Sequence, residues 1–472
     1  MSAFDETMAR WARRQPHRTA VVDDRSRLTY SELDTLVDAI GAALQRAGVG
    51  AGDIVSSQLP NCIEALALSL AVTRVGAVHN PMVTIYGRRE VDFIRAQARS
   101  AVIVDGRDHE LLHPDAARAT RGAAVPDATR YLLYTSGSTS APKGVRHSDR
   151  TLSTECAAQA GYHGLGGDEV FVMPSPVGHI SGLLYGILLP VWIGASSVLM
   201  PQWDPAAFLA LVEKERGTFC GGATPFLRGV VECPERSRYD VSSLRLFPCG
   251  GADVPPELIR AAIRELGIRT GRGYGSTEFP SITSSAGPDE PETKRAETDG
   301  RPIGDNEVRI VDGEIQARGP ECFLGYQDPS LDADAFSGDG WYRTGDLGTL
   351  DADGYLTVTG RLKDVIVRSG EKVSARELEE LLGRHPEVLA VAVVALPDAR
   401  TGERACACVV PRDAGDPPTL EGLGEFLLDL GLSRRKFPEQ LALLDGLPTT
   451  AAGKFDKPAL RARIEAAREG RS

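Results

Sequence analysis

A run of small hydroxylic residues and glycine between residues 131 and 144 has the composition of a phosphate-binding loop. An apolar strand is predicted over 131–134, and the loop after it contains Thr135, Ser136, Gly137, Ser138, Thr139 and Lys143. Backbone N–H groups and hydroxyls in such a loop can surround phosphate oxygens, while the lysine supplies positive charge. Pro142 stands where a Walker loop has the glycine before its lysine, so the loop is of another kind. The alternative is a solvent-exposed linker rich in serine and threonine.

Other short motifs follow it along the chain. They are Cys249-Gly250-Gly251-Ala252, Gly273-Tyr274-Gly275-Ser276-Thr277-Glu278, Trp341-Tyr342-Arg343-Thr344-Gly345-Asp346-Leu347-Gly348, Gly360-Arg361-Leu362-Lys363-Asp364 and the segment 447–457. Each is weak evidence alone, because short combinations arise by chance and an isolated lysine is usually solvated. Together, in this order and spacing, they resemble the AMP-binding, adenylate-forming superfamily of acyl-CoA synthetases, adenylation domains and firefly-type luciferases. Pro60-Asn61 and Asn80-Pro81 extend the resemblance to nearly the whole chain.

The motif 273–278 is, by this resemblance, the second nucleotide-binding segment. The ring of Tyr274 would stack on adenine, Thr277 would contact a phosphate and Glu278 would coordinate Mg²⁺. A carboxylate beside phosphates is repulsive unless a hard cation lies between them, so a metal at Glu278 is chemically sensible. The remaining members of this part of the expected nucleotide site are Gly273, Gly275, Ser276, Gly250, Gly251 and Ala252.

The later motifs imply the rest of the machinery. Asp346 would accept hydrogen bonds from both ribose hydroxyls, and Arg361 would join it there. Lys363 would be the hinge of a large domain rotation. Lys454 would be the catalytic lysine, and rotation would withdraw it while the loop around Gly370 shapes a pantetheine tunnel.

His179 matches the aromatic position that resembles the family's gate beside the acid pocket. A buried structural histidine is the alternative, although imidazole combines an apolar body with an easily tuned charge. The acid is expected against residues 181–184, residues 223–226 and the turns around Gly251 and Tyr274, which are mostly apolar. An amino-acid adenylation domain would place an aspartate near residue 177, and none is there. Aromatic or alicyclic acids are therefore favoured.

The sequence departs from the family pattern at three places. Ser140 replaces a loop glycine, which would strain the loop if that position needs a positive φ. Asp149 stands where the family often has histidine and is expected to add negative charge close to the phosphate loop. The segment 106–129 is shorter than usual, which predicts the loss of a strand or helix beside the acid site.

The leading hypothesis is an AMP-forming ligase that uses ATP and Mg²⁺ to adenylate a small acid and transfers the acyl group to coenzyme A. The sequence pattern of residues 176–184 looks closest to that of cyclohexanecarboxylate-type ligases. One alternative keeps adenylation but loads a carrier protein, or activates nitrite for an arylamine as a diazotase. A non-catalytic ligand-binding relic is disfavoured because Glu278, Asp346, Arg361 and Lys454 are all present. A luciferase-like oxygenase is the last alternative.

The composition is that of a globular protein with small-molecule substrates. The 472 residues carry a net charge of −12, which argues against a nucleic-acid-binding surface. Eight cysteines without paired spacing predict reduced thiols, and the absence of a signal pattern in the first thirty residues predicts a cytoplasmic protein. The family resemblance implies a monomer or homodimer. Residues 180–200 are uncharged and long enough to span a bilayer, but Pro190 and three glycines favour a buried helix running into a buried strand.

The elements that must position these residues predict an α/β fold. Helical periodicity over 31–44, with Ser31 and Asp34 as its capping pair, precedes short apolar runs at 53–59, 77–80 and 101–105 that alternate with helices. Alternation of this kind indicates helix-covered parallel sheets. Short β-like segments between 300 and 362 predict a small β-rich subdomain. We expect an N-terminal domain over 1–362 and a mobile α+β C-terminal domain over 363–472, with Ser374 and Glu377 as a capping box.

Overall fold

The computed structural model describes residues 2–123, 125, 127–135, 142–368, 371–398, 400–449 and 455–469. Its first sheet has the strand order β5-β3-β4-β6-β7, in which β3, β4, β5 and β6 pair in parallel and β7 is antiparallel to β6. The strands are β3 (Ile54–Gln58), β4 (Val78–Met82), β5 (Val102–Val104), β6 (Thr129–Thr135) and β7 (Lys143–Ser148). The predicted strands at 53–59, 77–80 and 101–105 are thus confirmed.

The helices around this sheet include α1 (Ala3–Arg14), α2 (Tyr30–Arg46), α3 (Ile63–Arg74), α4 (Arg88–Ala98) and α5 (Asp149–His163). The predicted amphipathic helix is α2, but the predicted capping pair is wrong. Thr29 is the N-cap and forms a reciprocal capping box with Glu32. The helix begins at Tyr30 because that side chain is fully buried, with its hydroxyl 2.7 Å from the Ala195 carbonyl.

A second body of strands combines strands near the N-terminus with strands from the middle of the chain. Its strands are β1 (Thr19–Val22), β2 (Arg27–Thr29), β8 (Val170–Met173), β9 (Ser196–Leu199), β10 (Gly222–Ala223), β11 (Leu246–Gly250), β12 (Arg269–Tyr274), β13 (Thr283–Ser284) and β14 (Arg301–Pro302). Its helices include α8 (Pro205–Glu215), α9 (Thr224–Val231), α10 (Pro256–Leu266) and α11 (Glu292–Glu297). The parallel register β10-β11-β12 brings the carboxyl ends of three strands side by side.

The uncharged run after residue 180 is buried protein interior. It forms α6 (Ile180–Leu183), a π-helical turn η2 (Leu184–Leu188) and α7 (Leu189–Ile193), and then enters β9. In the described part of the chain, no helix is long and apolar enough to cross a membrane. The interpretation as a buried helix leading into a buried strand is therefore confirmed.

A small antiparallel sheet follows, with the order β15-β16-β17-β18. It consists of β15 (Glu307–Val311), β16 (Glu314–Arg318), β17 (Tyr342–Leu350) and β18 (Leu356–Arg361), with the short helix α12 (Asp332–Ala335) in the connection. This is the β-rich subdomain that the glycine and aspartate turns predicted.

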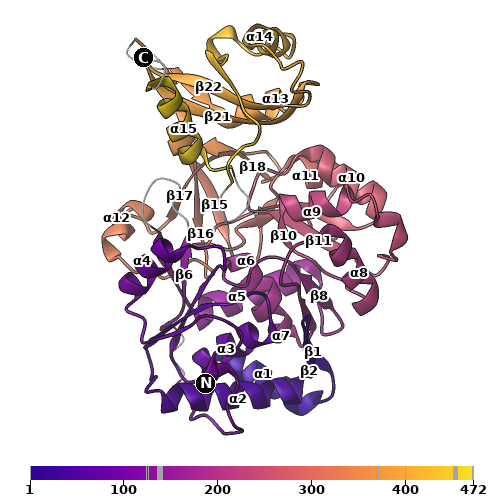
Figure 1. Cartoon of the computed structure of the whole chain (residues 1–472), viewed down its shortest axis with the longest axis vertical. Helices are drawn as coiled ribbons and strands as arrows, with labels where there is room; N and C mark the ends of the chain where they lie inside the picture. Colours follow the sequence, from indigo (N-terminus) through magenta and orange to yellow (C-terminus); the bar gives the residue numbers. More distant parts are fainter. Residues whose placement is uncertain are drawn as a thin grey trace.

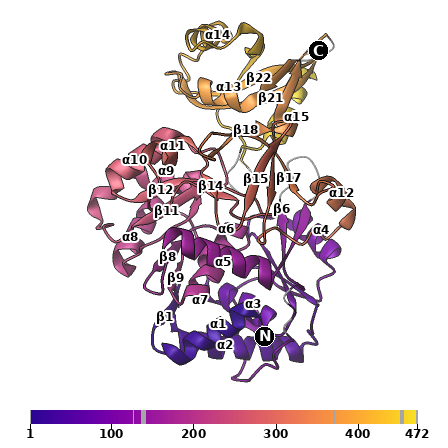
Figure 2. The same cartoon turned by 180° about the vertical axis from the view of Figure 1, so that it is seen from behind.

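The C-terminal region builds a sheet and a core of its own. Its elements are η5 (Leu362–Asp364), β19 (Val365–Arg368), β20 (Glu371–Ser374), α13 (Ala375–Leu382), β21 (Val388–Asp398), β22 (Gly402–Pro411), α14 (Leu420–Asp429), β23 (Gln440–Leu443) and α15 (Lys457–Glu469). This sheet lies at one end of the molecule, and the N-terminus with α1 and α2 lies at the other (Figure 1 and Figure 2). The N-cap Ser374 accepts a hydrogen bond from the Glu377 backbone N–H, as half of a capping box does. A domain boundary at residue 363 stays a prediction.

The cysteines are thiols, as expected. All eight lie within the described residues and form no disulfide with one another. Cys406 and Cys408 point to the same face of β22, where they pack in a buried cluster with Leu460 and Ile464 of α15. This packing attaches the last helix to the C-terminal sheet.

Candidate active site

The turns at the ends of β10, β11 and β12 form one edge of the candidate site. Ala223, Gly250 and Gly273 lie opposite one another in the parallel register. A Cβ on Gly250 would stand 2.4 Å from the Gly273 carbonyl oxygen, so only glycine allows this strand spacing. Gly251 has φ +75° and opens the turn toward Ala252. Ligand sites in open α/β sheets lie at such carboxyl ends.

Tyr274 at the end of β12 meets Asp346 and Arg361. The Tyr274 hydroxyl donates to Asp346 Oδ2 at 2.8 Å, and Arg361 Nε lies 2.8 Å from Asp346 Oδ1. Asp346 and Arg361 are also paired residues of β17 and β18. Burial, followed by the nearby charge of Asp346, raises the pKa of Tyr274 well above its usual value, so the hydroxyl remains a donor. The three residues predicted for the adenosine half of a nucleotide are therefore brought together.

Glu278 is hydrogen-bonded to Tyr326 from another part of the chain, and Lys143 lies over the ring of that tyrosine. Tyr326 Oη donates to Glu278 Oε1 at 2.9 Å, and the Lys143 ammonium lies 5.1 Å from the centroid of the same tyrosine ring. Burial, followed by the charge of Glu278, raises the pKa of Tyr326. Tyr326 was missed in the sequence, where Gly325-Tyr326 has no local signature of its own. Carboxylate oxygen is the ligand that Mg²⁺ prefers, so Glu278 fits the predicted metal.

The two ends of the predicted phosphate loop are paired with each other. Thr135 at the end of β6 lies opposite Lys143 at the start of β7. Ser136, Gly137, Ser138, Thr139 and Ser140 lie outside the described residues, as do Gly370 and Lys454. Their assignments stay predictions.

His147 is a second residue that the sequence did not reveal. Its Nε2 lies 2.8 Å from the Thr277 carbonyl oxygen and its Nδ1 lies 3.1 Å from Thr151 Oγ1. The carbonyl can only accept, so Nε2 carries the proton. Burial lowers the pKa of His147 to about 4, so the ring is neutral near pH 7. It joins the strand after the phosphate loop to the Thr277-Glu278 turn.

His179 is the N-cap residue of α6. Its Nδ1 lies 3.0 Å from Ser181 Oγ and 3.4 Å from the Ser181 backbone nitrogen. This contact gives His179 a structural role at the helix start. The gate role beside the acid pocket stays a prediction.

The carboxylate of Asp149 has a hydrogen-bond donor and a cation beside it within the protein. Its carboxylate accepts a hydrogen bond from Ser2 Oγ at 2.8 Å and lies 3.6 Å from Arg130 Nε. Burial raises the pKa of Asp149, and these two partners oppose the rise.

Burial, together with the charge of Arg361, lowers the pKa of Lys363, the predicted hinge.

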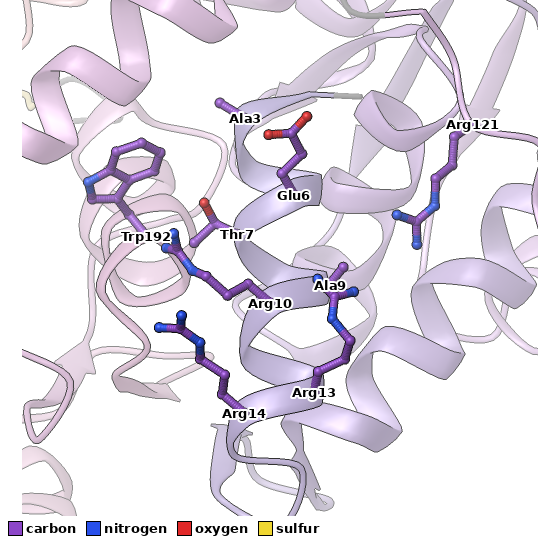
Figure 3. A pocket seen from close by; sticks show the side chains of 9 residues that line it. All are labelled: Ala3, Glu6, Thr7, Ala9, Arg10, Arg13, Arg14, Arg121 and Trp192. Carbon is purple, nitrogen blue, oxygen red and sulfur yellow. The ribbon is translucent and has the colours of Figure 1, made fainter.

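A hollow of the surface lies elsewhere, at the N-terminal helix. It has a volume of about 710 Å³, and Arg10 and Arg14 extend toward the side of Trp192 (Figure 3). No predicted site residue lines it. Arg13 and Arg14 lie in the last turn of α1, where positive charge complements the helix dipole.

Comparison with known proteins shows to which family the chain belongs. A family model described as AMP-binding enzyme matches residues 8–327, and one described as AMP-binding enzyme C-terminal domain matches residues 377–454. The chain belongs to the AMP-binding enzyme family. The predicted α/β fold and enzyme class, an adenylate-forming acid–thiol ligase that uses ATP, are thereby confirmed.

Relatives within this family span almost the whole AMP-binding chain. It is 33% identical to the medium-chain fatty-acid–CoA ligase of Escherichia coli (strain K12) over 504 residues, covering 96% of this chain and 89% of the relative. It is 33% identical to the feruloyl-CoA synthase of Amycolatopsis sp over 489 residues, covering 96% and 98%. The crystal structure of ATP-bound MatB from Rhodopseudomonas palustris matches with a TM-score of 0.90 at 26% identity, covering 98% of this chain and 99% of that chain.

Proposed function

We propose that this AMP-binding enzyme adenylates a small carboxylic acid with ATP and transfers the acyl group to coenzyme A. The observation that carries the proposal is that two groups of side chains lie beside the end of β12. Tyr274, Asp346 and Arg361 form one group, and the side chains of Glu278, Tyr326 and Lys143 form the other. Residues 274 and 278 belong to one short turn, so adenosine and phosphate subsites would be adjacent.

The first half-reaction would join an acid oxygen to the α-phosphorus of ATP and break the bond to pyrophosphate. Asp346 would hold the ribose hydroxyls, and Tyr274 would place its ring beside the adenine. Lys143 would neutralise phosphate charge, and Lys454 would do the same for the transition state. Mg²⁺ held by Glu278 would supply further charge neutralisation when bound. Little else is required of the protein, because phosphoryl transfer depends mainly on positioning and electrostatics.

The pocket for the acid would lie between α6, β10 and the strand-end turns. Gly221 and Gly222 are covered by the rings of Tyr185 and Phe226, which approach an added Cβ to 3.0 Å and 2.9 Å. If these rings line the acid pocket, as we propose, they would favour a compact aromatic or alicyclic acid over a long flexible chain. The feruloyl-CoA synthase among the relatives is named for an aromatic acid.

The second half-reaction would form a thioester from the acyl-adenylate and release AMP. Rotation about Lys363 would bring the loop around Gly370 toward the site. The relatives named as CoA ligases or synthases support coenzyme A as the acceptor. A carrier-protein thiol is the alternative acceptor.

The test is release of AMP and pyrophosphate from ATP with aromatic, alicyclic and fatty acids, and with nitrite plus an arylamine, each with and without coenzyme A. Release that depends on an acid, Mg²⁺ and Lys454, and that coenzyme A stimulates, is the expected result. Lys454→Ala serves as the inactive control. Release only with nitrite and an arylamine would replace the proposal with a diazotase. No release under any condition would contradict coenzyme A ligation.

A further inference from the structure

One face of α1 carries three arginines that have no acidic partner. Arg13 and Arg14 follow Arg10 at spacings of three and four residues, which places all three on the same side of the helix. They are exposed, and within the described residues none of them has a carboxylate at ion-pair distance. Like charges at these spacings repel each other and destabilise a helix. This face therefore has an electrostatic cost that no carboxylate of the described chain offsets.

The helix dipole accounts for only part of this arrangement. Arg13 and Arg14 lie in the last turn of α1, where positive charge is favourable, but Arg10 lies one turn earlier, beyond the reach of the dipole. A fourth arginine, Arg121, comes from a distant segment and lines the same hollow, where it lies 3.3 Å from the buried carboxylate of Asp5. The chain as a whole has a net charge of −12. The hollow is thus electropositive on a protein that is acidic overall.

The hollow has the size and the walls of a small-molecule site. Its volume of about 710 Å³ lies within the range of roughly 300–1,000 Å³ that is typical of ligand pockets. Arg10 and Arg14 extend from α1 toward Trp192 of α7 (Figure 3). The half-buried Trp192 ring packs edge-on against Phe4 with ring centroids 5.9 Å apart, and the Arg10 guanidinium lies 4.9 Å from the ring of Trp11. A flat ring and two guanidinium groups are therefore held beside one another.

We propose that this hollow binds a nucleotide, with its phosphates on Arg10, Arg13 and Arg14 and its base against Trp192. Guanidinium groups present planar sets of donors that match phosphate oxygens, and an indole ring is a stacking partner for a flat base. Glu6, the acid among the lining residues, can accept a hydrogen bond from a ribose hydroxyl or a base amine. The site is separate from the active site, because no residue predicted for the active site lines it.

The test is equilibrium dialysis of the full-length protein against labelled ATP and, in a second arm, against labelled coenzyme A. Both ligands combine a base with several phosphate charges, so the two arms show which of them the hollow takes. The variants are Arg14→Gln and Arg10→Gln combined with Arg14→Gln. Arg46→Gln is the matched control for Arg14→Gln, because Arg46 is also an exposed arginine in the last turn of its helix, α2, and has no carboxylate partner in the described chain.

We expect two binding sites for at least one of the two ligands in the wild type. One of them should weaken at least about tenfold in the double variant and about threefold in Arg14→Gln, with Arg46→Gln unchanged. Asp346→Asn should weaken only the other site, so failure of the proposed function would leave this result readable. A single site for both ligands in the wild type, or an equal loss in Arg46→Gln, would overturn the proposal.

The role of the ring is tested independently of the arginines. Trp192→Ala should weaken the same site about fivefold or more, and Trp192→Phe should retain most of the binding because it keeps a stacking ring. Inorganic tripolyphosphate that binds as tightly as the nucleotide, with Trp192→Ala unaffected, would overturn the assignment of a nucleotide. Binding of vesicles that contain anionic lipid, without a second nucleotide site, would replace the proposal with a membrane contact.

Hydrogen exchange gives a readout that needs no count of sites. The labelled ligand that occupies the hollow should slow exchange of the α1 backbone amides in the wild type and in Arg46→Gln, but not in the double variant. Urea unfolding of each variant checks that it is folded. Exchange in α1 that does not respond to either ligand in the wild type would overturn the proposal.

Discussion

At the scale of single residues, the side chains with expected chemistry depend on partners distant in sequence. Glu278 receives its hydrogen bond from a tyrosine 48 positions later, and the Thr277 carbonyl receives one from a histidine 130 positions earlier. Both partners are hydrogen-bonded at 2.8–2.9 Å. The raised pKa keeps the Tyr326 hydroxyl protonated, and the lowered pKa keeps the His147 ring neutral, with its one proton on Nε2 facing the carbonyl. They hold the second nucleotide motif in place without belonging to it.

The Tyr326 hydroxyl offers a direct test of that support. Tyr326→Phe removes the donor to Glu278, and we expect the Mg²⁺ concentration for half-maximal pyrophosphate exchange to rise about tenfold, since a hydrogen bond to a charged group contributes roughly 1.5–3 kcal/mol. The matched control is Tyr162→Phe, which removes a hydroxyl that donates to the Ser284 carbonyl at 2.6 Å. An unchanged Mg²⁺ requirement in Tyr326→Phe, or an equal rise in the control, would contradict the role given to Tyr326.

Sequence alone predicted the residues with a local signature and missed those without one. Asp346, Arg361 and Tyr274 each sit in a short motif, and the structure brings them within hydrogen-bond distance. Tyr326 and His147 could not be found in the same way, because a tyrosine after glycine and a histidine before serine are common. Only the folded structure reveals them. His147 lies on β7, which pairs antiparallel with β6, and contacts the Thr277 carbonyl, while Tyr326 contacts Glu278.

At the scale of elements, periodicity was enough for strands and helices but not for their exact ends. Ser31 with Asp34 and Thr29 with Glu32 both have the spacing of a capping pair. The second pair is the one that forms, because burial of Tyr30 against the Ala195 carbonyl includes that residue in the helix. A long-range contact therefore selected between two locally equivalent starts.

The two glycines in the turn after β11 are required for different reasons. In Gly250→Ala the new Cβ would meet the Gly273 carbonyl oxygen at 2.4 Å, so the β11–β12 pairing must shift, which costs roughly 1–3 kcal/mol or more. Gly251→Ala meets nothing within 4 Å and is strained only by φ +75°, which costs about 1 kcal/mol. Urea unfolding of both variants should therefore show the larger loss for Gly250→Ala, together with a larger loss of ATP binding. The reverse order would mean that backbone conformation, not strand spacing, fixes this turn.

At the scale of the whole molecule, stability includes the cost of two carboxyl groups buried side by side. Glu155 on α5 and Glu321 after β16 are both fully buried. Gln159 Nε2 donates to Glu155 at 3.2 Å, and Asn306 Nδ2 donates to Glu321 at 2.7 Å. Burial, followed by the charge of Glu155, raises the pKa of Glu321 to about 10. The pair joins the helix after the phosphate loop to the β-rich subdomain.

The sign of the resulting pH dependence follows from where the proton is held. Between its usual pKa of 4.5 and about 10, Glu321 is protonated in the folded chain and ionised in the unfolded chain. Its contribution to stability is therefore fully present below pH 4.5 and is lost as the pH rises through this window, by up to about 1.4 kcal/mol per pH unit.

Glu321→Gln removes the ionisation but keeps an amide of similar shape. We expect the stability of Glu321→Gln relative to the wild type to increase between about pH 5.5 and about pH 8.5, as measured by urea unfolding. Glu314→Gln, which removes a buried carboxylate paired with Arg343 at 3.2 Å, is the matched control. A difference between Glu321→Gln and the wild type that stays constant or shrinks with pH would show that Glu321 is ionised in the folded protein, and that the contact between α5 and the β-rich subdomain is a charged one.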